Sequence, residues 1–138
     1  MRDTGNRQLV GGGWCPFWFS MNMKWEIEFY QDSQGNIPVQ AFILQQPATV
    51  KAKFIHYIDM LQDFGLSLGQ PYVKKLKDDV WELRIRYSSN YYRILYFATS
   101  GHRFILVHTF LKKTKETPKS EIEVAKYRIN DYKQRYCL

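Results

Sequence analysis

The residue types best suited to chemistry in this chain are the cations on and just after three predicted strands. These are Arg84, Arg86, Arg93, Lys112 and Lys113. Arginine carries a fixed fork of N–H donors that matches phosphate oxygens. A convergent Arg/Lys set can stabilise a pentacovalent phosphoryl transition state. Cleavage of RNA by its own 2′-hydroxyl group needs that charge, in-line positioning and proton transfer, but no metal. We therefore interpret these five residues as candidate catalytic residues.

Positive charge is concentrated in the same part of the chain. Residues 72–115 carry ten Lys and Arg against three acids, which accounts for the whole formal net charge of +7. Because this stretch is predicted to form strands, the charge lies on a rigid sheet and can bind a polyanion there. Lys74, Lys75, Lys77 and Lys115 are candidate RNA-binding residues that contact phosphates. The alternative for the first three is a solvated loop.

The arginines have a structural alternative as well. Period-2 alternation places Glu82, Arg84 and Arg86 on one face of their strand, opposite the apolar Trp81, Leu83 and Ile85. A solvated sheet face with Glu82 as an ion-pair partner would produce the same spacing.

The register of the hairpin decides where Arg93 points. With a loop of residues 88–90, Arg93 faces Ile85 and leaves the charged face. With a loop of residues 88–91, it faces Arg86 and joins that face. The residues alone do not choose between the two.

Proton transfer requires an acid or a base, and two residues are candidates. His108 lies in a largely apolar strand, and Glu82 lies among the arginines. The structural alternatives are a packed histidine and an ion-paired carboxylate. The other histidines and the two cysteines show no ligand spacing, so we predict no metal site and no cofactor.

The elements that must position these residues follow from hydrophobic periodicity. Alternation and apolar runs predict strands over residues 25–30, 80–87, 91–97 and 103–111. Helical spacing and proline or glycine boundaries predict helices over residues 38–46, 48–64 and 118–136. The order β-α-α-β-β-β-α predicts an α+β fold with an antiparallel sheet. Two N-terminal helices and a C-terminal helix would pack mainly on one side of it.

One domain is expected. Residues 1–22 differ from the rest in carrying three consecutive glycines and an aromatic cluster, so we interpret them as an extension that is flexible or not native; residues 23–138 form the domain. No apolar run approaches the roughly 20 residues that span a bilayer. We expect a soluble, cytoplasmic protein without a membrane partner.

Three segments together resemble the RelE/HigB toxin superfamily, specifically its phage-derived Gp49-like branch. They are Trp-Glu-Leu-Arg-Ile at 81–85, Tyr-Arg-Ile-Leu-Tyr-Phe at 92–97, and Phe-Leu-Lys-Lys-Thr at 110–114 followed by Thr117-Pro118 and a Glu-rich helix. The resemblance covers residues 23–136. It implies a RelE-like fold and a ribosome-dependent messenger-RNA endonuclease, the toxin of a type II toxin–antitoxin pair. The implied partners are the ribosome, messenger RNA and a helix-turn-helix antitoxin.

The family pattern also suggests roles for individual residues. Arg84 and Arg86 fall on strand positions of catalytic or RNA-positioning residues, and Arg93 falls on the arginine of the Tyr-Arg motif. Lys112 or Lys113 falls where relatives place a basic residue that stabilises the transition state. This pattern favours the register that brings Arg93 beside Arg86.

One departure from the family pattern leaves other functions open. The tyrosine that several relatives carry near the start of the last helix has no match among residues 120–122. A non-catalytic RNA- or ribosome-binding module is therefore the alternative function. A third interpretation is an interaction domain whose basic groove accepts an acidic peptide.

Overall fold

The computed structural model describes residues 25–136; the predicted extension at 1–22 and both cysteines lie outside the described residues. The helices are α2 (Pro38–Leu44), α3 (Ala48–Phe64) and α4 (Lys119–Arg135), with a short 3₁₀ turn at Gly65–Ser67. The strands are β1 (Glu26–Phe29), β2 (Val73–Lys75), β3 (Trp81–Tyr87), β4 (Asn90–Thr99) and β5 (Arg103–Lys112). The predicted α+β layout is confirmed. Short β2 is an addition, because three residues are too few to show a period.

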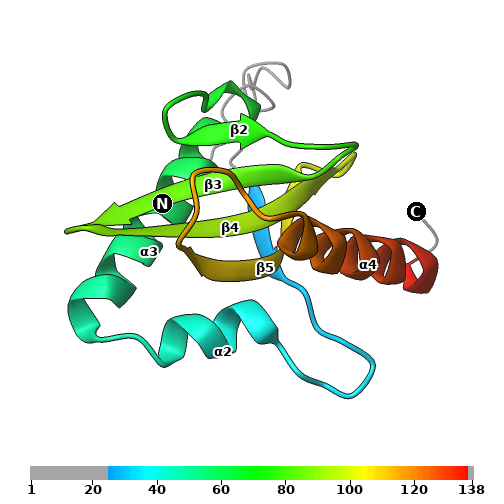
Figure 1. The fold of residues 1–138 in the computed structure, drawn as a ribbon. Coiled ribbons are helices and arrows are strands. Elements are labelled where there is room, and N and C mark those ends of the chain that lie inside the picture. The colour runs from blue at the N-terminus through cyan, green and yellow to red at the C-terminus, as the bar shows by residue number, and fades with distance from the viewer. Residues whose placement is uncertain (1–24, 137–138) are drawn as a thin grey trace, which may run out of the picture.

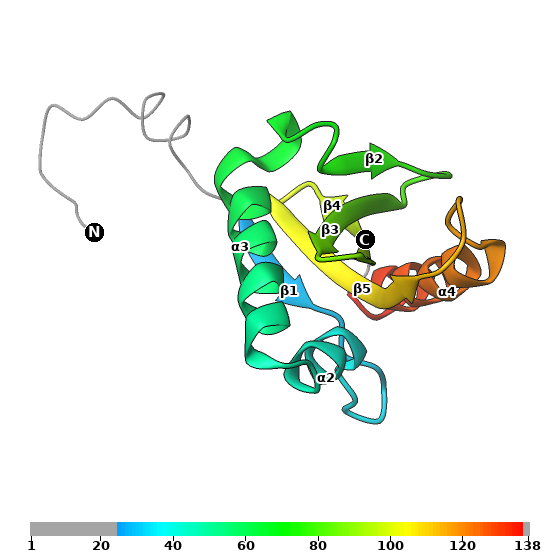
Figure 2. The same ribbon diagram turned by 60° about the vertical axis from the view of Figure 1, so that its left-hand side comes forward.

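The strands form one five-stranded sheet in the order β1-β5-β4-β3-β2 (Figures 1 and 2). Strands β2 to β5 pair antiparallel, whereas β1 runs parallel to β5. The sheet is therefore mixed rather than antiparallel throughout. A parallel pair needs a long connection, and the chain between β1 and β5 includes two helices and three strands.

The helices cover both faces of the sheet, where the sequence had indicated mainly one. Figure 2 shows α3 and α4 on opposite sides of the strands. The α2/α3 face buries Val39, Val50, Phe54, Leu61, Leu83, Ile94 and Phe104. The α4 face buries Leu95, Phe97, Ile105, Ala125, Ile129 and Tyr132. Because β4 and β5 are apolar on both sides, each face of these strands requires a helical cover.

Helix α3 ends at a glycine that no other residue could replace without strain. Gly65 has a φ of +57°, and a Cβ atom there would lie 2.5 Å from the Trp25 indole. Trp25 in turn stacks on Phe104, with ring centroids 4.3 Å apart. Trp25 thus lies against both the end of α3, at Gly65, and β5, at Phe104.

The α4 face of the sheet is covered over only part of its length. Helix α4 packs on the part of β4 and β5 that contains Phe97 and Ile105. Towards the β3–β4 hairpin, the same face carries Arg84, Arg86 and Arg93 in place of apolar residues. The fold therefore leaves a charged end of the sheet next to the start of α4. Within residues 25–136, no helix is long and apolar enough to cross a membrane.

Candidate functional site

The β3–β4 hairpin places Arg93 directly opposite Arg84. The strands are joined by a two-residue turn, with Tyr87 paired to Asn90 and Ser88 at a φ of +56°. Both predicted registers are therefore wrong. The true register differs by two residues from the one that set Arg93 opposite Arg86. Since side chains alternate with a period of two, Arg93 still joins the charged face.

Glu82 is the buried anion of this face, with a relative exposure of 1%. Its Oε2 accepts a hydrogen bond from Arg84 Nε at 3.1 Å, and its Oε1 lies 3.6 Å from Arg93 Nε. Thr117 Oγ1, from the loop before α4, donates a further short hydrogen bond to Oε1. Glu82 thus joins β3, β4 and the β5–α4 loop. These contacts favour its ion-pair interpretation over a role as a free base.

Arg93 is the most enclosed cation of the site, with only 8% of its side chain exposed. Its Nη1 donates to the Tyr92 carbonyl oxygen at 3.0 Å. Its Nε is the only buried side-chain nitrogen or oxygen among residues 25–136 that lacks a hydrogen-bond partner. Burial lowers the pKa of Arg93, and the negative charge of Glu82 opposes that shift. Arginine nevertheless stays charged, so a desolvated cation faces the site with unused hydrogen-bonding capacity.

Two adjacent hollows lie over these residues. The first, of about 490 Å³, is lined by Ser89, Tyr91, Arg93, Lys112, Lys113, Thr114 and Lys115. The second, of about 350 Å³, is lined by residues that include Lys74, Lys75, Lys77, Glu82, Arg84, Lys112, Lys115 and Thr117. Because they share Lys112 and Lys115, we call the two together the basic groove. A surface lined this densely with cations is suited to a phosphate backbone.

Lys112 stands at the centre of the basic groove. It is paired with Tyr91 across β4 and β5. Its pKa is lowered, first by partial burial and then by the positive charge of Arg93, with smaller contributions from Arg84 and Lys74; Glu82 opposes the shift. A lysine with a lowered pKa gives up its proton more readily than an ordinary one, so Lys112 is suited to donate a proton.

The groove therefore collects almost all of the predicted site residues. Arg86 is the exception among the arginines, because it is exposed and lines neither hollow. Its guanidinium Cζ lies 5.4 Å from the ring centroid of Tyr91. Lys75, which does line the groove, also has its Nζ 5.7 Å from the Trp81 ring centroid.

His108 is held elsewhere, by two residues of α4. Its Nε2 lies 2.5 Å from Glu121 Oε1, and its Nδ1 lies 3.2 Å from Arg128 Nη1. Since arginine can only donate, Nδ1 accepts and Nε2 carries the proton. Burial lowers the pKa of His108, and Glu121 opposes that shift. His108 lines neither hollow of the basic groove, so the geometry favours its packed interpretation.

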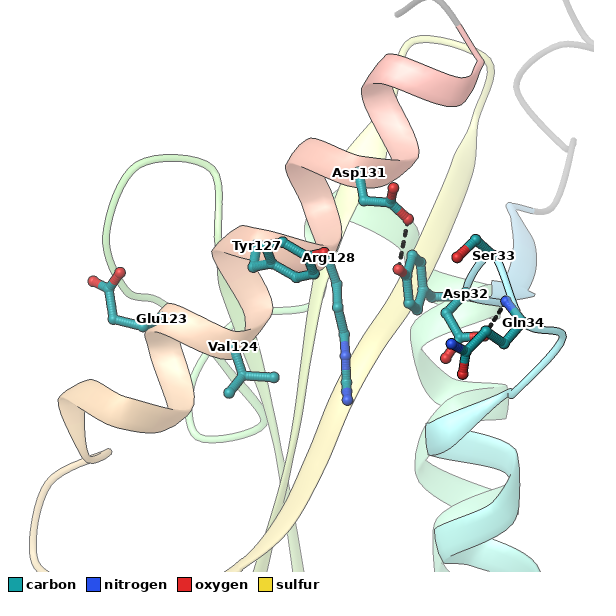
Figure 3. Close-up of a pocket in the computed structure, with 9 residues that line it drawn as sticks. Asp32, Ser33, Gln34, Glu123, Val124, Tyr127, Arg128 and Asp131 are labelled. Atoms are coloured by element: carbon teal, nitrogen blue, oxygen red, sulfur yellow. Dashed lines mark hydrogen bonds between the residues drawn. The ribbon is translucent and has the colours of Figure 1, made fainter.

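A larger hollow, of about 530 Å³, lies between α4 and the loop after β1 (Figure 3). Figure 3 shows Arg128 reaching from α4 towards β5, with Asp131 on the same helix. The Tyr30 hydroxyl donates a hydrogen bond to Asp131 Oδ2. Burial and this hydrogen bond raise the pKa of Tyr30 to about 12. Three of the lining residues, Asp32, Glu123 and Asp131, are acidic. This acidic hollow suits a polyanion less well than the basic groove does.

Sequence reasoning assigned no site role to Tyr91, and it used Thr117 only as part of the start of the last helix and of the family resemblance, yet both residues border the site. Tyr91 lies two residues before Arg93 on β4 and therefore on the same face of the sheet. This spacing indicates a site residue only when it is known that Arg93 faces the site. Thr117 meets Glu82 across 35 positions of sequence, and no local pattern indicates that contact. Within residues 25–136, no three His, Cys, Asp or Glu side chains are grouped to hold a metal ion.

Comparison with known families adds one finding. Residues 41–130 match the family described as phage-derived protein Gp49-like. The match extends from α2 through the charged strands and most of α4, and it includes the central residues of the basic groove. A search of curated proteins finds no match to the chain.

Proposed function

The chain belongs to the phage-derived Gp49-like family, and from this membership and the basic groove we propose that it cleaves messenger RNA on the ribosome. The family indicates the toxin of a toxin–antitoxin pair, and hence an antitoxin as partner. The finer proposal is a metal-independent endoribonuclease of the RelE/HigB type, neutralised by a helix-turn-helix antitoxin in the cytoplasm.

The observation that carries this proposal is the environment of Arg93. Its buried guanidinium lies opposite Arg84, and its Nε makes no hydrogen bond although it lies 3.6 Å from Glu82 Oε1; the nearby Lys112 has a lowered pKa. Leaving a buried donor without a hydrogen bond is costly, and a catalytic role is one explanation for such a group. The non-bridging oxygens of a phosphate match this need in charge and in geometry.

The proposed reaction is transfer of the phosphoryl group to the neighbouring 2′-oxygen. The bond from the 2′-oxygen to phosphorus forms and the bond from phosphorus to the 5′-oxygen breaks, leaving a 2′,3′-cyclic phosphate and a 5′-hydroxyl group. Arg84 and Arg93 stabilise the charge on the phosphorane oxygens. Lys112 protonates the leaving 5′-oxygen, and the 2′-hydroxyl proton is lost to water. The ribosome holds the RNA in line for attack.

The other lysines of the groove are proposed to bind the substrate and not to take part in the chemistry. Lys74, Lys75, Lys77 and Lys115 line the groove around the reacting centre and bind flanking phosphates. Lys113 lines the first hollow beside Lys112 and adds to the positive potential there.

The experiment that tests this function maps RNA ends. Purified protein is incubated with messenger-programmed ribosomes or with the same messenger alone, and 5′ ends are located by primer extension. We expect new ends only when ribosomes are present. Absence of new ends, with the protein still co-sedimenting with ribosomes, would instead support the non-catalytic binding module.

A further inference from the structure

Tyr91 is an aromatic side chain exposed at the basic groove. Its relative exposure is 42%, whereas its neighbour Tyr92 is buried. It lies at the start of β4, in the part of the strand that α4 does not cover. It lines the hollow of about 490 Å³ in the basic groove, together with Arg93 and Lys112. Neither core packing nor a hydrogen bond explains why a tyrosine stands at this position.

The surroundings of Tyr91 fix its ring next to positive charge. The Arg86 guanidinium lies 5.4 Å from the ring centroid, within the range of a cation–π interaction. On the other side of β4, Lys112 is the direct cross-strand partner of Tyr91. Tyr91 therefore lies on β4 between two cationic residues of the neighbouring strands, Arg86 on β3 and Lys112 on β5, at the border of the groove that would bind phosphates.

An aromatic face beside phosphate-binding cations fits an unpaired nucleobase. Proteins that bind single-stranded RNA combine a positive groove with side chains on which bases stack, and the stacking tolerates any base because each has a π face. A double helix hides its bases and an acidic peptide offers no flat ring, so neither uses Tyr91 in this way.

We propose that Tyr91, supported by Arg86, is the stacking platform for one unpaired base of the RNA substrate. The phosphate next to that base lies on Arg93 and Lys112. This proposal rests on the proposed function, since it takes RNA as the substrate class, but it concerns binding and does not require that the RNA be cleaved.

The test compares two short single strands of equal length, an RNA and an abasic strand that keeps the ribose-phosphate backbone. Binding of each to the full-length protein is measured by fluorescence anisotropy without ribosomes. We expect Tyr91→Ala to weaken RNA binding on the order of tenfold, because stacking of one base contributes about 1–3 kcal/mol. Binding of the abasic strand should be unchanged. Tyr91→Phe and Tyr91→Trp should both retain RNA binding, because a ring suffices.

The matched control is Tyr127→Ala, which removes a more exposed tyrosine, 73% accessible, from α4 beside the acidic hollow. It should change neither affinity. The proposal is overturned if wild-type protein binds RNA no better than the abasic strand, or if Tyr91→Ala weakens both strands equally. It is also overturned if Tyr91→Phe behaves like Tyr91→Ala.

The same variants separate this inference from the proposed function. If the protein cleaves RNA on ribosomes but binds the RNA and the abasic strand equally well, the proposed endonuclease is supported and the stacking role of Tyr91 is refuted. If Tyr91→Ala loses affinity only for the RNA strand, and the wild-type protein yields no new RNA ends on ribosomes, the stacking role is supported and the endonuclease proposal is refuted.

Discussion

At the residue scale, the site depends on one buried carboxylate among several cations. Glu82 contacts Arg84, Arg93 and Thr117, and it is nearly inaccessible to solvent. Without this negative charge, the two arginines would repel each other at the centre of the charged face. Glu82 thereby allows desolvated arginines to remain at the end of a packed sheet.

Replacing Glu82 by glutamine should therefore destabilise the fold. The substitution keeps the side-chain volume but leaves a buried Arg93 without its counter-charge. We expect the free energy of unfolding to fall by about 3 kcal/mol or more, measured by urea denaturation. Glu123→Gln, at an exposed carboxylate on α4, should stay within about 0.5 kcal/mol of wild type. Equal stability of the two variants would show that Glu82 does not hold the arginines.

Lys112 leads to a prediction about pH. Its pKa is lowered from the ordinary lysine value, so its proton is lost at a lower pH than that of an ordinary lysine. If Lys112 protonates the leaving oxygen, cleavage should decrease as pH rises through this lowered pKa. Lys112→Arg keeps the charge but does not titrate in this range, so its cleavage should be slower and lack that decrease. The measurement is the rate of cleavage on programmed ribosomes from neutral to alkaline pH.

A control separates Lys112 from titration of other groups. Lys113→Arg changes the adjacent lysine of the same hollow and should keep the wild-type pH profile. An unchanged alkaline decrease in Lys112→Arg would contradict the proton-donor role.

At the element scale, the hairpin and the loop before α4 assemble the groove. The β3–β4 hairpin brings Arg93 opposite Arg84, and β5 adds Lys112 on the next strand. The loop then crosses back over the charged face, where Thr117 reaches Glu82. Lys115 lies on that loop and lines both hollows. The contact between Thr117 and Glu82 therefore fixes one wall of the groove.

Thr117→Val should loosen the loop before α4, because valine keeps the shape of the side chain but lacks the hydroxyl group. With the hydrogen bond to Glu82 lost, we expect trypsin to cleave after Lys115 several-fold faster, because local opening exposes the loop. Peptide mapping by mass spectrometry follows the cleavage. Thr99→Val removes a hydrogen bond to the Arg103 carbonyl oxygen, away from this loop, and serves as the control. Equal cleavage rates in the two variants would show that the Glu82 contact does not hold the loop.

Elements with a strong period could be predicted from sequence, whereas their relations in space could not. Strands β3, β4 and β5 and the three helices follow their hydrophobic patterns. The parallel pairing of β1 depends on which edge of β5 stays free, and no local pattern encodes that choice. The hairpin register was missed because Ser88 adopts a positive φ without being the glycine or asparagine that usually indicates a two-residue turn.

For the candidate site, the sequence predicted which cations share a strand face and a sheet end. Alternation along β3 placed Arg84 with Glu82, and the cations of the later strands could be expected at the same sheet end. The positions of His108 and Tyr91 could not be read in this way. His108 is held by α4 side chains, and the role inferred for Tyr91 depends on which end of the sheet α4 leaves uncovered.

At the scale of the whole molecule, the two sides of α4 differ in charge. The basic groove lies beside its first turn, whereas Asp32, Glu123 and Asp131 surround the hollow along its length. The basic groove and the acidic hollow thus border the same helix. Near the groove, Lys126 of α4 forms an ion pair with Asp78. A polyanion would therefore be attracted to one end of the sheet and repelled from the other surface of α4.

This asymmetry predicts how RNA binding depends on salt. Lys75→Ala should weaken binding of single-stranded RNA and reduce the slope of log affinity against log salt by about 0.7, the value for one phosphate contact on a single strand. Lys53→Ala, an exposed lysine on the α3 side of the sheet, should leave the slope unchanged. Titrations at several salt concentrations provide the measurement, and equal slopes in both variants would contradict a phosphate contact at Lys75.

The proposed stabilisation of the transition state by Arg93 is measured by the single-turnover rate of cleavage on saturating, programmed ribosomes for Arg93→Ala. Arg103→Ala is the matched control, since Arg103 pairs with Glu26 and Glu28 at the far end of β5. We expect a loss on the order of 10² to 10³ in rate for Arg93→Ala, with ribosome binding retained, and a near wild-type rate for the control. Wild-type cleavage by a folded Arg93→Ala protein would contradict the proposed role.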